Sequence, residues 1–188
     1  MNRFDAGSPF DDSQKIDKKL CDFFTDCPPS VKILNYFLPF RTKYQYPTTE
    51  IHAMMKLTVY SDGGSRGNPG PSAYAIVVVE NDRIIHEHSE YLGINTNNYA
   101  EYRGLIAGIV KALELGADEV EFVMDSELVI RQMNGEYKVK SPNIASLHND
   151  AVALSQQIGK VKFTHVRRSN DFVSHADALL NHRMDISS

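Results

Sequence analysis

Beyond residue 55, the spacing of apolar and polar residues changes several times, and each change predicts a new element. Alternating or nearly continuous apolar runs predict strands at 57–61, 73–80 and 83–92. The run at 73–80 contains AIVVV, which is apolar on both faces and predicts a buried strand in the interior of a sheet. Two later runs with strand-like spacing lie at 118–125 and 160–166.

Helical spacing separates these later strands. Residues 96–117 have apolar positions three and four apart, with Thr96 or Asn97 as the cap and Gly116 at the end. Further helices are predicted for residues 126–135, 141–159 and 174–184. The resulting order, βββαβααβα, predicts an α/β domain with a mixed sheet.

The first 54 residues have a different character. Residues 11–24 place their large apolar side chains on one helical face, and residues 27–38 begin with prolines typical of a second short helix. Residues 39–53 have the composition of a linker. We therefore expect an N-terminal extension, helical and of unassigned role, over 1–54, and a second domain over 55–188.

The 188-residue chain has a net charge of −4, and its acids and bases balance within residues 1–54. The negative excess in the second domain argues against a broad basic surface for nucleic acid, but not against a protein that brings its own divalent metal. Apolar runs fall short of a membrane span, and the N-terminus has no signal-peptide pattern. Cys21 and Cys27 fit neither a zinc spacing nor a disulfide framework, so we expect a cytoplasmic protein.

The segment LTVYSDGGSRGNPGPSAYAIVVV, residues 57–79, combines glycines, prolines and one aspartate between two apolar runs. It could be a loop that cradles phosphate or a hairpin that displays Asp62. A phosphate loop needs a helix N-terminus, whereas here a strand follows and the pattern G-x-x-x-x-G-K-[ST] is absent. The hairpin is therefore the better interpretation, although a lone aspartate in a turn is as often structural.

Three further acids occupy comparable positions. Asp125 follows a strand, Glu101 lies one turn into the long helix, and Asp177 falls in the first turn of the last predicted helix. If the strands that end at Asp62 and Asp125 are parallel neighbours, these two carboxylates lie side by side. Acids gathered at one sheet edge would repel one another without a cation, and oxygen ligands favour Mg²⁺ or Mn²⁺.

Four sequence blocks, YSDGGSRGNPG, TNNYAEYRGLIAGI, VMDSELVIRQMNGEYKVKSP and HADALLN, resemble the type 1 ribonuclease H family over about residues 56–185. The resemblance is to the variant common in archaea and some bacteria, also found as a reverse-transcriptase-like domain. It implies a mixed five-stranded sheet flanked by helices. It also implies an endoribonuclease that uses two Mg²⁺ or Mn²⁺ ions to cut the RNA strand of RNA–DNA hybrids, leaving 5′-phosphate and 3′-hydroxyl ends. Activity on double-stranded RNA and the oligomeric state stay open.

The resemblance also implies roles for individual residues. The family's metal centre falls on Asp62, Glu101, Asp125 and Asp177. Substrate contacts are expected at Gly63, Gly64, Asn68, Thr96, Asn97, Asn98, Ser126, Lys138, Lys140, Arg167 and Arg168. Amide side chains suit this role because they donate and accept without charge, and so can sense a 2′-hydroxyl and minor-groove edges.

The chain departs from the family pattern in two places. The basic helical handle of many bacterial members is reduced to GEYKVKSP, and the loop HVRRSNDFVSHAD has no counterpart of the family's catalytic histidine. His165 is expected in a strand, and His175 is a secondary candidate for proton transfer or product release.

Two other functions share features with this sequence. A sugar-kinase or actin-like ATPase shares a DGGS hairpin but needs two related domains around a nucleotide cleft, which this chain lacks. A catalytically silent binding module of the same fold is disfavoured because all four acids are present.

Overall fold

The computed structural model describes residues 54–187. Backbone contacts divide the chain into two units, Met1–Thr49 and Glu50–Ser188, and the described residues belong to the second. The helices predicted for residues 11–24 and 27–38 lie outside the described residues, and so does most of the predicted extension.

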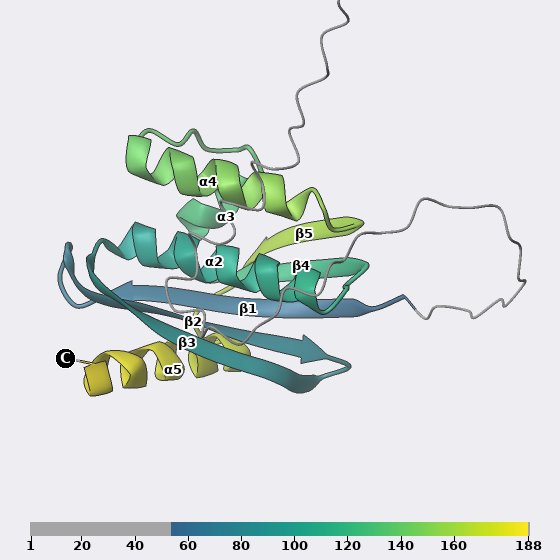
Figure 1. Ribbon diagram of the computed structural model, residues 1–188, viewed down its shortest axis with the longest axis horizontal. Helices are drawn as coiled ribbons and strands as arrows, with labels where there is room; N and C mark the ends of the chain where they lie inside the picture. The colour runs from purple at the N-terminus through teal and green to yellow at the C-terminus, as the bar shows by residue number, and fades with distance from the viewer. Residues whose placement is uncertain (1–53, 188) are drawn as a thin grey trace, which may run out of the picture. The chain divides into compact units, whose positions relative to one another are not determined.

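A five-stranded sheet forms the centre of the described domain (Figure 1). The strands are β1 (Lys56–Ser65), β2 (Gly70–Glu80), β3 (Arg83–Asn95), β4 (Glu119–Met124) and β5 (Lys160–His165). Their order is β3-β2-β1-β4-β5, with β1 antiparallel to β2 and parallel to β4. The predicted mixed sheet is confirmed, and β1 is its middle strand.

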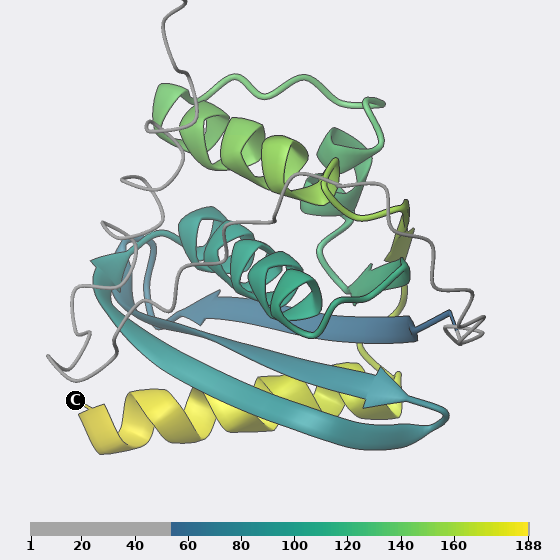
Figure 2. The same cartoon turned by 45° about the vertical axis from the view of Figure 1, so that its right-hand side comes forward.

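Helices cover both faces of this sheet (Figures 1 and 2). They are α2 (Asn97–Glu114), α3 (Glu127–Met133), α4 (Pro142–Ser155) and α5 (Asp171–Ser187). Helix α2 lies on one face, with α3 and α4 beyond it, and α5 runs along the opposite face. Within residues 54–187, every helix is too short or too polar to cross a membrane.

The predicted glycine-rich hairpin is longer than the sequence indicated. Strand β1 continues through Asp62 to Ser65, and β2 already begins at Gly70. Asp62 pairs with Ala75 inside the ladder, so the expectation that Asp62 ends its strand is wrong. The reason is that antiparallel pairing with β2 extends β1 beyond its apolar run, and Asp62 is presented from within a strand.

The last helix also starts earlier than predicted. The side-chain oxygen of Asn170 accepts hydrogen bonds from the backbone N–H groups of Phe172 and Val173, at 3.1 and 3.2 Å. This cap starts α5 at Asp171, three residues before the predicted start. Asp177 therefore lies in the second turn of the helix, not in the first.

Glycines allow α2 to lie unusually close to β1. A Cβ atom on Gly63 would fall 2.3 Å from the backbone carbon of Ala100 and from the nitrogen of Glu101. A Cβ atom on Gly108 would fall 2.8 Å from Cγ1 of Val59. The backbone of Glu101 is thus held directly against the residue that follows Asp62.

We expect Gly63→Ala to lower the free energy of unfolding by about 1–3 kcal/mol, because the new methyl group would force the α2 backbone away from β1. Urea denaturation in EDTA would measure the change. Gly64→Ala is the matched control, since its Cβ atom would meet only the flexible end of Leu180, at 3.2 Å. Equal unfolding midpoints for the two variants would contradict this account of the packing.

Candidate active site

Asp62 is the most enclosed of the four acids, with 4% of its surface exposed. Its Oδ1 accepts a hydrogen bond of 2.8 Å from the backbone N–H of Gly63, while its buried Oδ2 has no hydrogen-bond partner. Burial, together with the nearby negative charges of Asp125 and Asp177, raises the pKa of Asp62 to about 7. This carboxylate is therefore poorly stabilised by its protein surroundings alone.

Asp125 directly follows β4, the parallel neighbour of β1. Tyr60 and Val123 are paired in the register of the two strands, so Asp62 and Asp125 each lie two residues beyond a matched pair. This is the side-by-side arrangement expected from neighbouring parallel strands.

Glu101 approaches the same place from helix α2. Its Oε1 accepts a hydrogen bond of 2.9 Å from the side-chain amide of Asn97, and the hydroxyl of Ser126 is a second partner. Burial raises the pKa of Glu101 to about 7, the charge of Asp125 adds to the rise, and the two hydrogen bonds oppose it. Asn97 and Ser126 thus hold the Glu101 carboxylate in a fixed orientation.

Asp177 comes from the other face of the sheet, on α5. The side-chain amide of Asn181, one turn later, donates to Oδ1 of Asp177 at 3.2 Å and to its carbonyl oxygen at 2.9 Å. The predicted metal-binding acids therefore come from β1, α2, α5 and the end of β4, which are far apart in the sequence.

One guanidinium joins three of these acids. Nη2 of Arg168 lies 2.8 Å from Oδ1 of Asp177 and 3.6 Å from Oδ2 of Asp62, and its Nε lies 3.5 Å from Oδ2 of Asp125. Among residues 54–187, no three His, Cys, Asp or Glu side chains are arranged closely enough to hold a metal ion. In this conformation the positive charge among the carboxylates is that of Arg168.

The predicted substrate residues of the hairpin and of the start of α2 lie together. The side-chain oxygen of Asn68 accepts a hydrogen bond of 3.2 Å from the backbone N–H of Asn97. Thr96, one of the two caps predicted from the sequence, caps α2 by accepting from the backbone N–H of Tyr99. The turn between β1 and β2 and the start of α2 thus form one polar rim beside Glu101.

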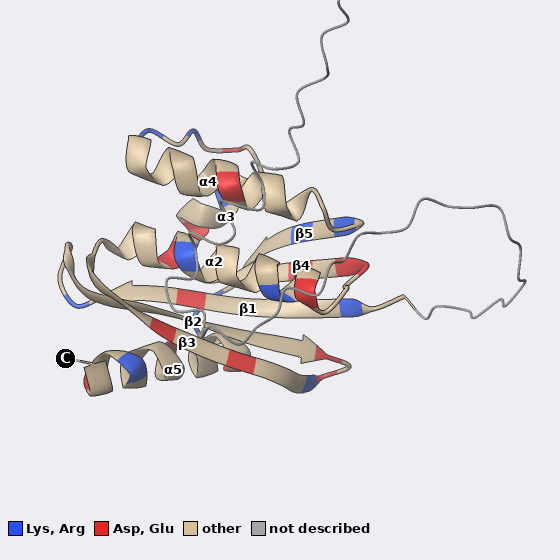
Figure 3. Cartoon of the chain, viewed as in Figure 1, with Lys and Arg blue, Asp and Glu red and all other residues tan. Residues whose placement is uncertain are grey.

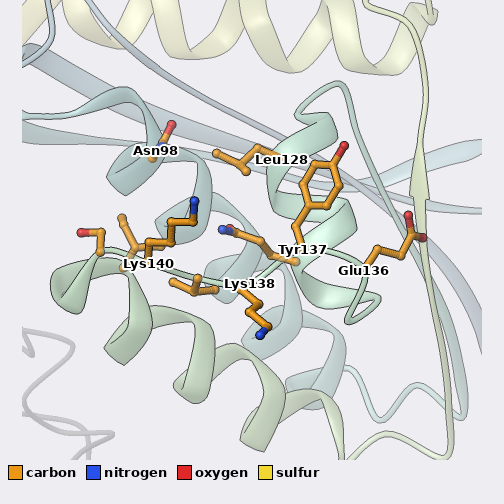
Figure 4. Close-up of a pocket in the computed structure, with 10 residues that line it drawn as sticks. Asn98, Leu128, Glu136, Tyr137, Lys138 and Lys140 are labelled. Carbon is orange, nitrogen blue, oxygen red and sulfur yellow. The ribbon is translucent and has the colours of Figure 1, made fainter.

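In the described part of the chain, basic residues are spread over several elements and lie among acidic ones (Figure 3). Lys138 and Lys140 belong to the segment between α3 and α4, which lines a hollow of about 580 Å³ together with Asn98. Leu128 and Tyr137 border the same hollow (Figure 4).

Leu128 and Tyr137, which are 38% and 46% exposed, were not among the residues predicted from the sequence. The tyrosine within GEYKVKSP was the available signal, since an aromatic residue followed closely by two lysines suits a surface that binds nucleic acid. Arg131 lies over the Tyr137 ring, 5.1 Å from its centroid, and helps to fix the orientation of the ring.

Three other basic or titratable residues form no ion pair with the four acids within residues 54–187. Nε2 of His175 is 2.7 Å from Oε1 of Glu87 on β3, so this imidazole links α5 to the edge strand. His165 ends β5, as predicted for a strand residue. Arg167 is exposed and, within the part of the chain that the structure describes, forms no ion pair with the four acids.

Comparison with known proteins agrees with this geometry. The model of the family described as reverse transcriptase-like matches residues 60–182. The bifunctional protein Rv2228c of Mycobacterium tuberculosis is 43% identical over 136 residues, which are 71% of this chain and 37% of that protein. Ribonuclease HI of Halobacterium salinarum is 37% identical over 69% of this chain and 65% of its own length. The chain thus spans little more than a third of the mycobacterial relative.

Solved structures show the same likeness. The ribonuclease H1 of Halobacterium salinarum superposes with a TM-score of 0.67 at 37% identity, over 70% of this chain and 98% of that one. The LC11 ribonuclease H1, solved in complex with an RNA/DNA hybrid, has a TM-score of 0.65 at 36% identity, over 70% of this chain and 98% of that one. From its sequence, its sheet topology and these relatives, the chain belongs to the type 1 ribonuclease H family, within the reverse transcriptase-like group.

Proposed function

We propose that residues 55–188 form a metal-dependent endoribonuclease that cuts the RNA strand of RNA–DNA hybrids, and that residues 1–54 are an extension outside the catalytic domain. The observation that carries this proposal is the meeting of three carboxylates around one guanidinium, with Glu101 beside them. Membership of the ribonuclease H family supports it, as does a relative solved with an RNA/DNA hybrid.

The donor atoms fit divalent metal ions. Oδ2 of Asp62 is buried without a hydrogen-bond partner, and the four candidate ligands offer only carboxylate oxygens, which suit Mg²⁺ or Mn²⁺. Asp62 and Asp125 would be shared ligands, Glu101 would hold one ion, and Asp177 the other. Two bound ions would supply an activated water and stabilise the leaving 3′-oxygen, giving 5′-phosphate and 3′-hydroxyl ends.

Residues of the rim would select the substrate. Asn68 and Asn97 would contact the minor groove and the 2′-hydroxyl groups, and Glu101 would contact a ribose next to the scissile bond. The backbone of the Gly63–Gly70 hairpin would approach the RNA strand closely.

Lysine and arginine side chains around the site would contact phosphates. Lys138 and Lys140 lie beside Asn98 at the hollow, and Arg167 and Arg168 lie in the loop before α5. Because the domain carries a net negative charge, such local contacts would replace a broad basic surface.

A second candidate is a binding module of the same fold without catalysis. The position of Arg168 among the acids favours it, because in this arrangement no group of described residues is ready to hold a metal ion. Cleavage assays separate the two candidates, since only the enzyme turns the hybrid over.

The substrate prediction is tested with labelled duplexes in which one strand contains all, four, one or no ribonucleotides. We expect cleavage of the first two, poor cleavage at a single ribonucleotide and no cleavage of DNA, because recognition needs several consecutive 2′-hydroxyls. Denaturing gels would measure the rates. Equal rates on all four duplexes would rule out recognition of the ribose.

We expect Asp125→Asn to reduce hybrid cleavage in Mg²⁺ by about a thousandfold or more, because it removes a ligand charge while keeping the shape of the side chain. Single-turnover kinetics would measure the loss. Glu114→Gln removes the same charge at the distant end of α2 and should keep its rate. An Asp125→Asn enzyme with near-normal turnover would overturn the assignment of this residue.

The raised pKa values predict how the metal-free protein responds to pH. Asp62 and Glu101 titrate near 7 in the folded state, but near their ordinary values of 3.8 and 4.5 when unfolded. Between about pH 4 and pH 7 the folded protein binds more protons than the unfolded one, so its stability falls as the pH rises.

Calorimetry in EDTA from pH 4 to pH 8 should therefore show that the melting temperature of the wild type declines more than that of the double variant Asp62→Asn, Glu101→Gln. Parallel profiles for the two proteins would show that these carboxyl groups are not perturbed.

A further inference from the structure

Arg168 occupies a distinctive place in the loop between β5 and α5. Its carbonyl oxygen accepts a hydrogen bond of 2.8 Å from the hydroxyl of Ser174, which anchors the backbone to the first turn of α5. The side chain itself is 66% exposed, yet its guanidinium lies within 3.6 Å of three carboxylates. Because the backbone is anchored and the side chain is largely exposed, the guanidinium can move away from the carboxylates without any rearrangement of the fold.

The same three carboxylates are candidate metal ligands, so two kinds of cation compete for them. Without a positive charge, Asp62, Asp125 and Asp177 would repel one another and disfavour the folded state. The guanidinium relieves part of that repulsion with a planar set of N–H donors. A metal ion would draw its ligands from the same carboxylates and would be repelled by the guanidinium, so the two cations compete for this place.

We propose that Arg168 is a built-in counter-cation: it holds Asp62, Asp125 and Asp177 together in the metal-free protein and is displaced when a divalent cation binds. The proposal rests on the metal-dependent function above. The guanidinium then sets the metal concentration at which the site fills. The site binds divalent ions only when their concentration is high enough to displace the Arg168 side chain.

Arg167 provides a matched control. It carries the same charge one residue away, is exposed, and forms no ion pair with the four acids in the part of the chain that the structure describes. Arg167→Ala therefore removes the same long-range positive charge as Arg168→Ala but leaves the carboxylate contacts in place. A difference between the two variants reports on those contacts alone.

The test is calorimetric titration of the full chain with Mn²⁺ at pH 8. We expect Arg168→Ala to bind Mn²⁺ about three- to thirtyfold more tightly than Arg167→Ala, because three partly exposed ion pairs no longer compete. In EDTA, the melting temperature of Arg168→Ala should be about 2–6 °C below that of Arg167→Ala, because the carboxylates lose their counter-cation. Arg168→Lys should recover most of this difference.

Equal or weaker Mn²⁺ binding by Arg168→Ala would overturn the proposal, and so would equal melting temperatures in EDTA. The proposed function fails differently. If Arg168→Ala binds Mn²⁺ more tightly but neither it nor the wild type cuts a hybrid, the counter-cation is supported and the nuclease is not. If neither the wild type nor any of the three variants binds Mn²⁺, both proposals fall.

Discussion

Repulsion between carboxylates is the constraint around which the described domain is organised. Asp62 and Asp125 lie on neighbouring parallel strands, and the backbone of Glu101 is pressed against β1 because Gly63 has no side chain. Asp177 reaches the same place from α5, on the opposite face of the sheet. Four elements thus bring like charges to one point, which is costly unless a cation is present.

Three sets of contacts reduce the repulsion between these carboxylates. The backbone N–H of Gly63 donates to Asp62, and Asn97 and Ser126 donate to Glu101. Arg168 brings a positive charge to the remaining oxygens. The pKa values of Asp62 and Glu101 nevertheless rise to about 7, so these contacts offset only part of the effect of burial and of the neighbouring negative charges. A preorganised negative site of this kind is suited to divalent cations, which in the proposed function would neutralise the charge that develops at a phosphate.

Much of the fold could be predicted from the sequence, because the apolar spacing and the helix caps of each segment agree with the element that the segment forms in the folded domain. Apolar runs predicted the strands, and Thr96 was one of two predicted caps for the long helix. The rule for crossover connections favoured β1 and β4 as parallel neighbours, which they are. What escaped prediction depends on tertiary contacts. Pairing with β2 carried β1 past Asp62, and the Asn170 cap moved the start of α5.

Side-chain directions at the candidate site could not be predicted for the same reason. The sequence placed Arg168 in a loop, but only the folded chain shows that its guanidinium faces three acids while Arg167 does not. The sequence likewise placed His175 on the last helix, where it faces Glu87 on β3. The hollow beside Tyr137 depends on the path of the segment between α3 and α4, which has no periodic pattern.

Anomalous diffraction from crystals of the full chain soaked in Mn²⁺ would test the metal site most directly. We expect anomalous peaks within coordination distance of Asp62 and Asp125, with Glu101 or Asp177 as further ligands and the guanidinium of Arg168 moved away. A map with no anomalous peak at these carboxylates at saturating Mn²⁺, and with Arg168 still bridging Asp62, Asp125 and Asp177, would contradict this expectation.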